Sequence, residues 1–238
     1  TLIHGYFFMN LTKTIIFGVI TIVFIFAVIK IYYNSKIVKK YHNTTRFMAR
    51  VAIFGAISAL LYIFIKFPVP FLPSFLEFHF DEIPAFIAGF AYGPLTAFCV
   101  LLVKTVIKLP FTTTLCVGEI CDLLYSIVFI LPAVIIYNKH RNFKYAMLGL
   151  GIGTLLQLGV SLIANIYIII PFYMSVMGLS EEAILGLCQQ ANPAITNIGW
   201  MYGLLGVLPF NVIKDSAVLV LTIIAYKSTH RFVDKLHE

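Results

Sequence analysis

Long apolar runs, separated by turn-forming and charged residues, make up most of the chain. They predict seven hydrophobic helices, at about 14–33, 47–66, 82–92, 94–109, 119–137, 144–171 and 198–226. A helix needs roughly 20 apolar residues to cross a bilayer, and most of these runs are long enough. The two shorter runs are separated by Gly93 and Pro94, which break a helix. We therefore predict an all-α, polytopic membrane protein.

Two connections between the predicted helices have distinctive compositions. Residues 67–81 are rich in Pro and Phe and are more hydrophobic than an ordinary loop in water. This segment is expected either to fold back over the mouth of the bundle or to lie in the membrane interface. The connection 172–197 is expected to hold a short helix that begins near Ser180, because Ser followed by two Glu is typical of a helix start.

Composition and charge agree with a membrane protein and indicate its orientation. Of the 238 residues, 61% are hydrophobic and 11% are charged, whereas soluble domains average about 25% charged residues. Eleven of the 17 Lys and Arg fall in three segments, 34–50, 138–144 and the tail from 227. By the positive-inside rule these segments, and so the C-terminus, are expected to be cytoplasmic. The net charge of +7 then reflects topology and not a nucleic-acid partner.

The sequence lacks the motifs of common catalytic and metal sites. It contains no G-x-x-x-x-G-K-[ST], H-E-x-x-H or G-x-S-x-G pattern. The cysteines at 99, 116, 121 and 188 have no metal-ligand spacing and indicate no disulfide framework. We therefore predict no catalytic residue, no metal site and no bound cofactor.

Three polar side chains lie inside the last two apolar runs. Asn211 and Lys214 are three residues apart and share one helical face, with Lys214 near the middle of its run. An ammonium there costs on the order of 2.5–3.5 kcal/mol. Its partner is therefore expected to be either a carboxylate or carbonyl group on a neighbouring helix or a polar ligand. Asn165 lies at a similar depth, where it either holds helices together or meets Asn211 across one cavity.

Charged residues are also expected to meet between the fourth and fifth helices. Glu119 and Asp122 open the fifth helix, where the helix dipole favours carboxylates. Lys104 and Lys108 lie one turn apart near the end of the preceding helix. We expect these residues to pair across the Thr-rich connection, either as an ion-pair brace or as the wall of a site.

Residues before the third helix carry further candidates. Asp81 and Glu82 are expected to cap this helix, whose first turn contains Pro84. Glu82 is also a candidate site residue, because it lies where the Phe-rich loop meets the bundle. For His79, in the same segment, an ordinary role in the loop is expected.

Small residues form a stripe on the second helix near its predicted cytoplasmic end. Ala52, Gly55 and Ala56 have the spacing that lets two helices approach closely. Such a stripe packs either within its own chain or against a partner.

Several motifs occur together and in a consistent order. They are Phe-Leu-Glu-Phe-His-Phe-Asp-Glu-Ile-Pro-Ala (75–85), Ala-Gly-Phe-Ala-Tyr-Gly-Pro-Leu (88–95), Lys104, Val-Gly-Glu (117–119), Asn165 with Tyr167 and Pro171, and Leu-Pro-Phe-Asn-Val-Ile-Lys (208–214). Over about 47–227 the chain resembles the riboflavin-binding S components of energy-coupling-factor (ECF) vitamin transporters, the RibU/FmnP family. Pro-Phe-Asn-x-Ile-Lys is the most specific of these motifs.

The resemblance implies a six-helix S component, residues 47–238, in the bacterial plasma membrane. Such a subunit captures its vitamin from outside, without catalysis, and docks on an ECF transmembrane subunit driven by two ATPase subunits. Residues 1–46 would then be an extra N-terminal transmembrane helix with a basic cytoplasmic linker. The resemblance further implies that Asn165, Asn211 and Lys214, with Glu82, bind the flavin ring, and that Ala52 and Ala56 form the docking surface.

The sequence also departs from the pattern of this family. Asp215 replaces the usual glycine after the motif lysine, and Glu119 and Asp122 stand where Gln or Glu followed by Asn is usual. Extra carboxylates can change the preferred charge of the ligand, so an S component for another vitamin or a nucleobase-like precursor is an alternative. A membrane enzyme that uses Glu119, Asp122 and the lysines is an alternative from a different class, and an accessory structural subunit is another.

Overall fold

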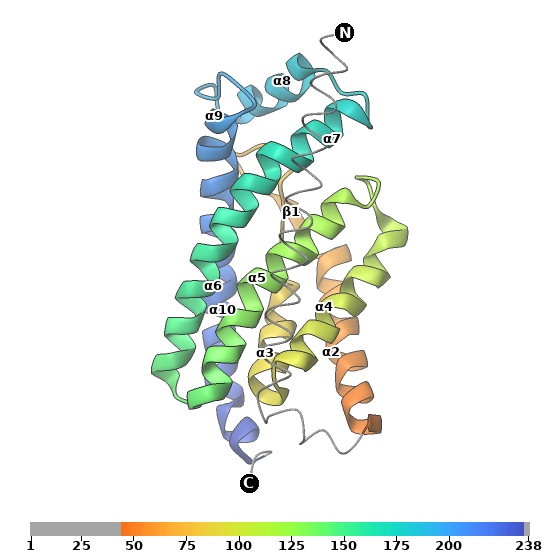
Figure 1. Cartoon of the computed structure of the whole chain (residues 1–238). Coiled ribbons are helices and arrows are strands. Elements are labelled where there is room, and N and C mark those ends of the chain that lie inside the picture. The colour runs from red at the N-terminus through yellow and green to blue at the C-terminus, as the bar shows by residue number, and fades with distance from the viewer. Residues whose placement is uncertain (1–43, 236–238) are drawn as a thin grey trace.

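The structure is a computed structural model that describes residues 44–235, with side chains described for 45–226. Its main body is a bundle of roughly aligned helices (Figure 1). The bundle consists of α2 (Thr44–Phe64), α3 (Glu82–Tyr92), α4 (Pro94–Lys108), α5 (Val117–His140), α6 (Phe143–Ala164) and α10 (Leu208–Lys235). The predicted helix at 14–33 and its linker up to residue 43 lie outside the described residues, and residues 44–46 of that linker belong to α2.

Five helical spans among the described residues are long and apolar enough to cross a membrane. They are Thr45–Phe64, Pro94–Phe111, Val117–His140, Phe143–Ser175 and Trp200–Tyr226. The prediction of an all-α, polytopic membrane fold is therefore confirmed.

The short helix α3 lies at the centre of the bundle. It packs against α2, α4, α5 and α10, and its apolar residues are almost all buried. This all-round burial explains why a helix of 11 residues is apolar on every face. Its Phe86 and Phe90 side chains contact Phe129 and Tyr137 of α5 edge-on, which fixes α3 against its neighbour.

The α5–α6 pair approaches closely through glycine. A Cβ atom added at Gly153 would lie 2.1 Å from the carbonyl oxygen of Phe129, so no other residue fits there without moving a helix. The turn between these helices is set by Asn142, whose side chain accepts a hydrogen bond from the Lys144 backbone N–H.

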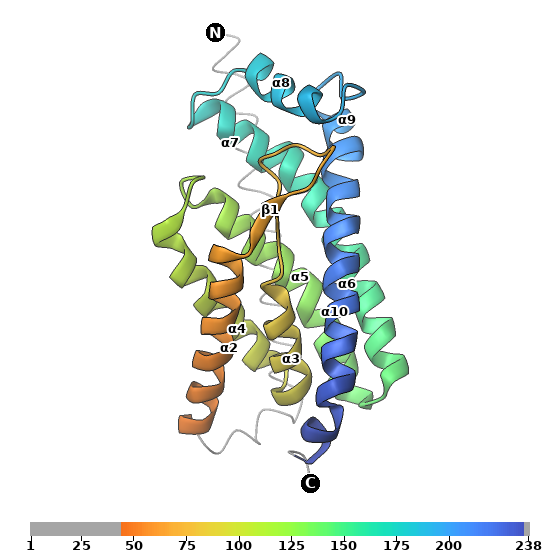
Figure 2. The ribbon, with the colours of Figure 1, turned by 180° about the vertical axis from the view of Figure 1, so that it is seen from behind.

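A hairpin and several short helices cover one end of the bundle. The Phe-rich segment forms strands β1 (Lys66–Pro68) and β2 (Glu77–His79), which pair antiparallel with Phe67 opposite Phe78. Figure 2 shows this hairpin crossing between α2 and the upper part of α10. In the structure this segment folds back over the mouth of the bundle, which is one of the two placements expected for it. Phe78 is buried there.

Two π-helical turns interrupt segments that the sequence predicted as continuous helices. η3 (Asn165–Ile169) joins α6 to α7 (Ile170–Ser175), and η4 (Gly203–Val207) joins α9 (Trp200–Tyr202) to α10. The two turns pack against each other, and a Cβ at Gly203 would lie 2.7 Å from side chains of α6 and η3. A π-helical turn holds one more residue than an α-helical turn, and such turns are frequent at functional sites. The helix expected near Ser180 is α8 (Glu181–Ala191), capped by the Ser180 side chain.

Candidate functional site

A cavity of about 320 Å³ lies beneath the hairpin, between the wall formed by η3 and α10 and the turn that joins α4 to α5. This volume is at the lower end of the range of small-molecule sites, about 300–1,000 Å³. Five of the predicted site residues line it: Asn165, Asn211, Lys214, Glu119 and Asp122. The other two, Glu82 and Lys104, do not line it but form ion pairs with the lining residues Lys214 and Asp122, respectively.

Asn211 and Lys214 project from the same face of α10, as their spacing predicts. The Asn211 carboxamide donates to the Val207 carbonyl oxygen and accepts a hydrogen bond from Gln157 Nε2, both at 2.9 Å. Lys214 Nζ lies 2.7 Å from Glu82 Oε1 and 3.6 Å from Asp122 Oδ1. The expected carboxylate partners are present, and Lys214 also lines the cavity, so its contact with a ligand stays a prediction.

Asn165 begins the π turn η3 and is held by three partners. Its Nδ2 donates to the Ser161 carbonyl oxygen at 2.9 Å and to the Tyr125 hydroxyl at 3.3 Å. Its Oδ1 accepts a hydrogen bond from the Tyr202 hydroxyl at 3.1 Å. Asn165 and Asn211 line one cavity, as expected from their similar depth, and Asn165 also holds helices together.

A buried cluster of charges connects the hairpin to the bundle. Lys104 Nζ donates to Asp81 and, at 3.0 Å each, to Asp122 Oδ2 and Ser126 Oγ. His79 Nδ1 pairs with Asp81, and its Nε2 lies 3.5 Å from Asp122 Oδ1. The cluster therefore ties β2, α3, α4 and α5 together at the floor of the cavity.

Two expectations for this region are wrong. Asp81 occupies the N-cap position of α3 as expected, but its side chain makes no capping hydrogen bond, because its carboxylate is bound by His79 and Lys104. Burial acts to raise the pKa of Asp81, but these two neighbours outweigh it and hold the pKa well below its usual range. His79 is not an ordinary loop residue, since it is buried and lines the cavity.

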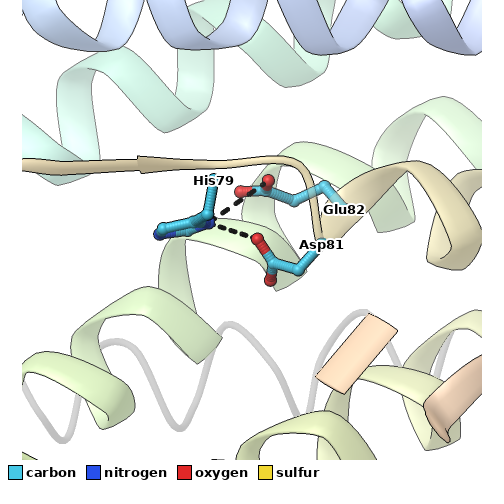
Figure 3. Close-up of side chains that lie close together, drawn as sticks. All are labelled: His79, Asp81 and Glu82. Carbon is cyan, nitrogen blue, oxygen red and sulfur yellow. Dashed lines mark hydrogen bonds and ion pairs between the residues drawn. The ribbon is translucent and has the colours of Figure 1, made fainter. Parts of the chain in front are cut away.

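His79, Asp81 and Glu82 lie close enough together to hold a metal ion, and Figure 3 shows the imidazole beside both carboxylates. The donor set nevertheless fits a cation poorly. The ammonium groups of Lys104 and Lys214 already bind these carboxylates. A metal ion here would face two positive charges, so the cluster is best described as a network of ion pairs.

The expected pairing between the fourth and fifth helices occurs only in part. Asp122 pairs with Lys104, but Glu119 pairs with no lysine among the residues whose side chains are described. Its Oε2 instead accepts hydrogen bonds from the hydroxyls of Thr112 and Thr114 at 2.8 and 2.9 Å. Lys108 Nζ lies over the Tyr62 ring, 5.2 Å from its centroid.

The small-residue stripe on α2 divides between two faces. Gly55 is buried, and a Cβ added there would lie 2.6 Å from the Val103 side chain of α4. Ala52 and Ala56 are exposed on the adjoining face of the helix. Gly55 therefore serves packing within the chain, whereas the two alanines are accessible to a partner.

Several residues of the site were not predicted from the sequence. Tyr62, Tyr125 and Tyr202 resemble core aromatics in apolar runs, and the sequence carries no signal for their role. Gln157 had a usable signal, because Gln157, Ser161 and Asn165 recur every four residues and so form one polar stripe along α6 and η3.

Comparisons with known proteins cover most of the described chain. The family described as the substrate-specific component of ECF transporters matches residues 46–226. The riboflavin transporter RibU of Staphylococcus aureus (strain TCH60) is 29% identical over 189 residues, which is 79% of this chain and 93% of the relative. The riboflavin transporter FmnP of Bacillus subtilis (strain 168) is 28% identical over 168 residues, which is 68% of this chain and 80% of the relative. A solved structure of the S component of a bacterial ECF transporter aligns with a TM-score of 0.63 and 28% identity, over 80% of this chain and 99% of that one.

Proposed function

This chain belongs to the family of substrate-specific components of ECF transporters, and on that premise we propose that it captures riboflavin, or a close flavin, for uptake across the bacterial cell membrane. The relatives named riboflavin transporters support the choice of ligand. The observation that carries the proposal is the convergence of Asn165, Asn211 and Lys214 on one cavity.

The two carboxamides offer complementary groups to a ring that carries carbonyls and an N–H. Asn211 uses one N–H for Val207 and its oxygen for Gln157, so its second N–H remains as a donor to a ring carbonyl. Asn165 uses both N–H groups, and its oxygen accepts one bond and keeps a second lone pair. It is therefore suited to accept a hydrogen bond from the ring N–H.

Lys214 completes the polar edge of the proposed site. An ammonium has three N–H donors, and Glu82 and Asp122 engage at most two of them. The third is available to a ring carbonyl or nitrogen. The apolar part of the ring then lies against Phe75, Ile169 and other side chains of the cavity, which gives affinity through burial.

In this proposal the loaded subunit docks on an ECF transmembrane subunit with two ATPase subunits. The exposed pair Ala52 and Ala56 on α2 is the proposed contact, because small side chains permit close helix packing. In the proposed orientation the hairpin end of the bundle faces outside and the C-terminus is cytoplasmic, because the basic segment 138–144 lies at the end opposite the hairpin (Figure 1). Residues 47–238 form the S component proper, with 1–46 as an additional segment.

The absorption spectrum of the full chain, purified from cells grown with riboflavin, tests the proposal. We expect a flavin spectrum that survives size-exclusion chromatography, with one riboflavin per chain released on denaturation. Protein that binds a different vitamin in stoichiometric amount, or that stays colourless after incubation with riboflavin, would contradict the proposed ligand.

A further inference from the structure

We propose that Lys108 and Glu119 form a second subsite, which binds the uncharged polyhydroxylated tail of the ligand and selects against a phosphorylated tail. This inference rests on the proposed binding of a flavin. It concerns the connection between α4 and α5. The charged residues at its two ends are not among those proposed to bind the ring.

Lys108 is a buried cation with no anionic partner among the side chains that the structure describes. It is 5% exposed and lines the cavity, and its ammonium contacts the Tyr62 ring. Among the residues with described side chains, no carboxylate lies within 4.0 Å of it, in contrast to Lys104 and Lys214. A buried ammonium is costly unless it is paired or hydrogen-bonded. A ligand oxygen in the cavity would supply the missing acceptor.

Glu119 is the matching anion on the first turn of α5. It is 4% exposed and also lines the cavity. Both of its hydrogen bonds, from Thr112 and Thr114, reach Oε2. Within the described part of the chain Oε1 accepts no hydrogen bond, so it is available to a ligand donor.

A cation and an anion that do not pair with each other are suited to hydroxyl groups. A hydroxyl can donate to the Glu119 carboxylate and accept from the Lys108 ammonium, and a polyol chain offers several of them. The side chains proposed to bind the ring belong to η3 and α10, whereas Lys108 ends α4 and Glu119 lies in the first turn of α5, on the other side of the bundle (Figure 1). A ligand whose ring edge contacts Asn165, Asn211 and Lys214 can therefore extend its tail to Lys108 and Glu119.

The same charges disfavour a phosphate on the tail. The lysines buried at and behind the cavity are matched by at least as many carboxylates. The lysines are Lys104, Lys108 and Lys214, and the carboxylates are Asp81, Glu82, Glu119 and Asp122. A phosphate monoester brings almost two negative charges. No surplus of positive charge compensates them here, and Glu119 repels them directly.

Binding of three flavins to the purified full chain tests this subsite. Lumiflavin has the ring but a methyl group in place of the tail, riboflavin has the neutral tail, and flavin mononucleotide has the phosphorylated tail. We expect Lys108→Met and Glu119→Gln each to weaken riboflavin binding about tenfold, as for the loss of hydrogen bonds to a charged group, with less than a twofold change for lumiflavin. Glu119→Gln is also expected to narrow the preference for riboflavin over flavin mononucleotide.

Lys66→Met is the control, because Lys66 is partly exposed and does not line the cavity, although its partner Glu77 does. It is expected to leave all three affinities within twofold. Equal losses for riboflavin and lumiflavin in the variants, or a wild type that prefers flavin mononucleotide, would overturn the subsite. If Lys108→Met does not fold, Glu119→Gln makes the same comparison. A wild type that binds none of the three flavins would contradict the proposed function itself.

Discussion

Replacement of Lys214 by methionine separates a ligand contact from a structural ion pair. The substitution keeps the volume of the side chain and removes its charge. It deletes the proposed hydrogen bond to the flavin, and bonds from charged donors are worth about 1.5–3 kcal/mol. Riboflavin should therefore bind roughly 10- to 100-fold more weakly, because each 1.4 kcal/mol is about tenfold in Kd.

The same substitution also affects stability, because it leaves the buried Glu82 carboxylate without its ammonium partner at 2.7 Å. Breaking a buried ion pair from one side costs about 3–5 kcal/mol. Lys104→Met is the matched control, since Lys104 is equally buried and pairs with Asp81 and Asp122 but does not line the cavity. It should lower the unfolding temperature in a similar way and reduce the affinity far less.

Titration of riboflavin fluorescence gives the affinity, and thermal unfolding in the same detergent gives the stability. The double variant Lys214→Met with Glu82→Gln provides a further check, because it removes both charges of the pair. It should recover part of the lost stability while riboflavin binding stays weak. An unchanged Kd for Lys214→Met, or equal losses of affinity for the two lysine variants, would refute the assignment of Lys214 as a ligand contact.

Three further predictions concern the Asn165 carboxamide, the proposed docking contact on α2 and the packing of α6 against α5. Asn165→Leu should weaken riboflavin binding about tenfold in a fluorescence titration, because it removes the proposed acceptor and deprives the Tyr202 hydroxyl of the carboxamide oxygen to which it donates; an unchanged Kd would argue against it. Ala56→Phe should leave riboflavin binding intact but abolish copurification with the ECF subunits and riboflavin uptake by cells, whereas normal uptake would exclude this face as the contact. Gly153→Leu should lower stability by at least about 1–3 kcal/mol through overpacking against α5. Gly159→Leu on the same helix, where a Cβ meets nothing within 4 Å, should unfold at nearly the wild-type temperature; equal effects would contradict the packing argument.

The helices of the bundle were predictable because a long uninterrupted run of apolar residues is enough to indicate a membrane-spanning helix. Apolar runs and breakers such as Gly93-Pro94 located α2 to α5 to within a few residues. The predicted run 144–171 is divided in the structure into α6, η3 and α7, and the run 198–226 into α9, η4 and an α10 that continues to Lys235. The π turns η3 and η4 were not predictable, because an extra residue in a helical turn changes backbone hydrogen bonding without changing the hydrophobic pattern. The pairing of the hairpin strands likewise depends on tertiary contacts over the bundle.

The candidate site was predictable where a polar residue is out of place in an apolar run. That argument located Asn165, Asn211 and Lys214 correctly on one cavity. It did not apply to Asp81, for which a local capping argument predicted a helix contact. Lys104 lies 23 residues away in the sequence and takes this carboxylate in the folded chain. Contacts of this kind are set by packing, so local patterns do not predict them.

The most direct test of the central claim is an equilibrium titration of the ligand-free, purified full chain with riboflavin, followed by the quenching of flavin fluorescence. Our account predicts saturable quenching at one riboflavin per chain, with quenching by the Lys214→Met variant displaced to at least tenfold higher concentrations. Wild-type protein that gives no saturable quenching, while its thermal unfolding shows that it is folded, would contradict it.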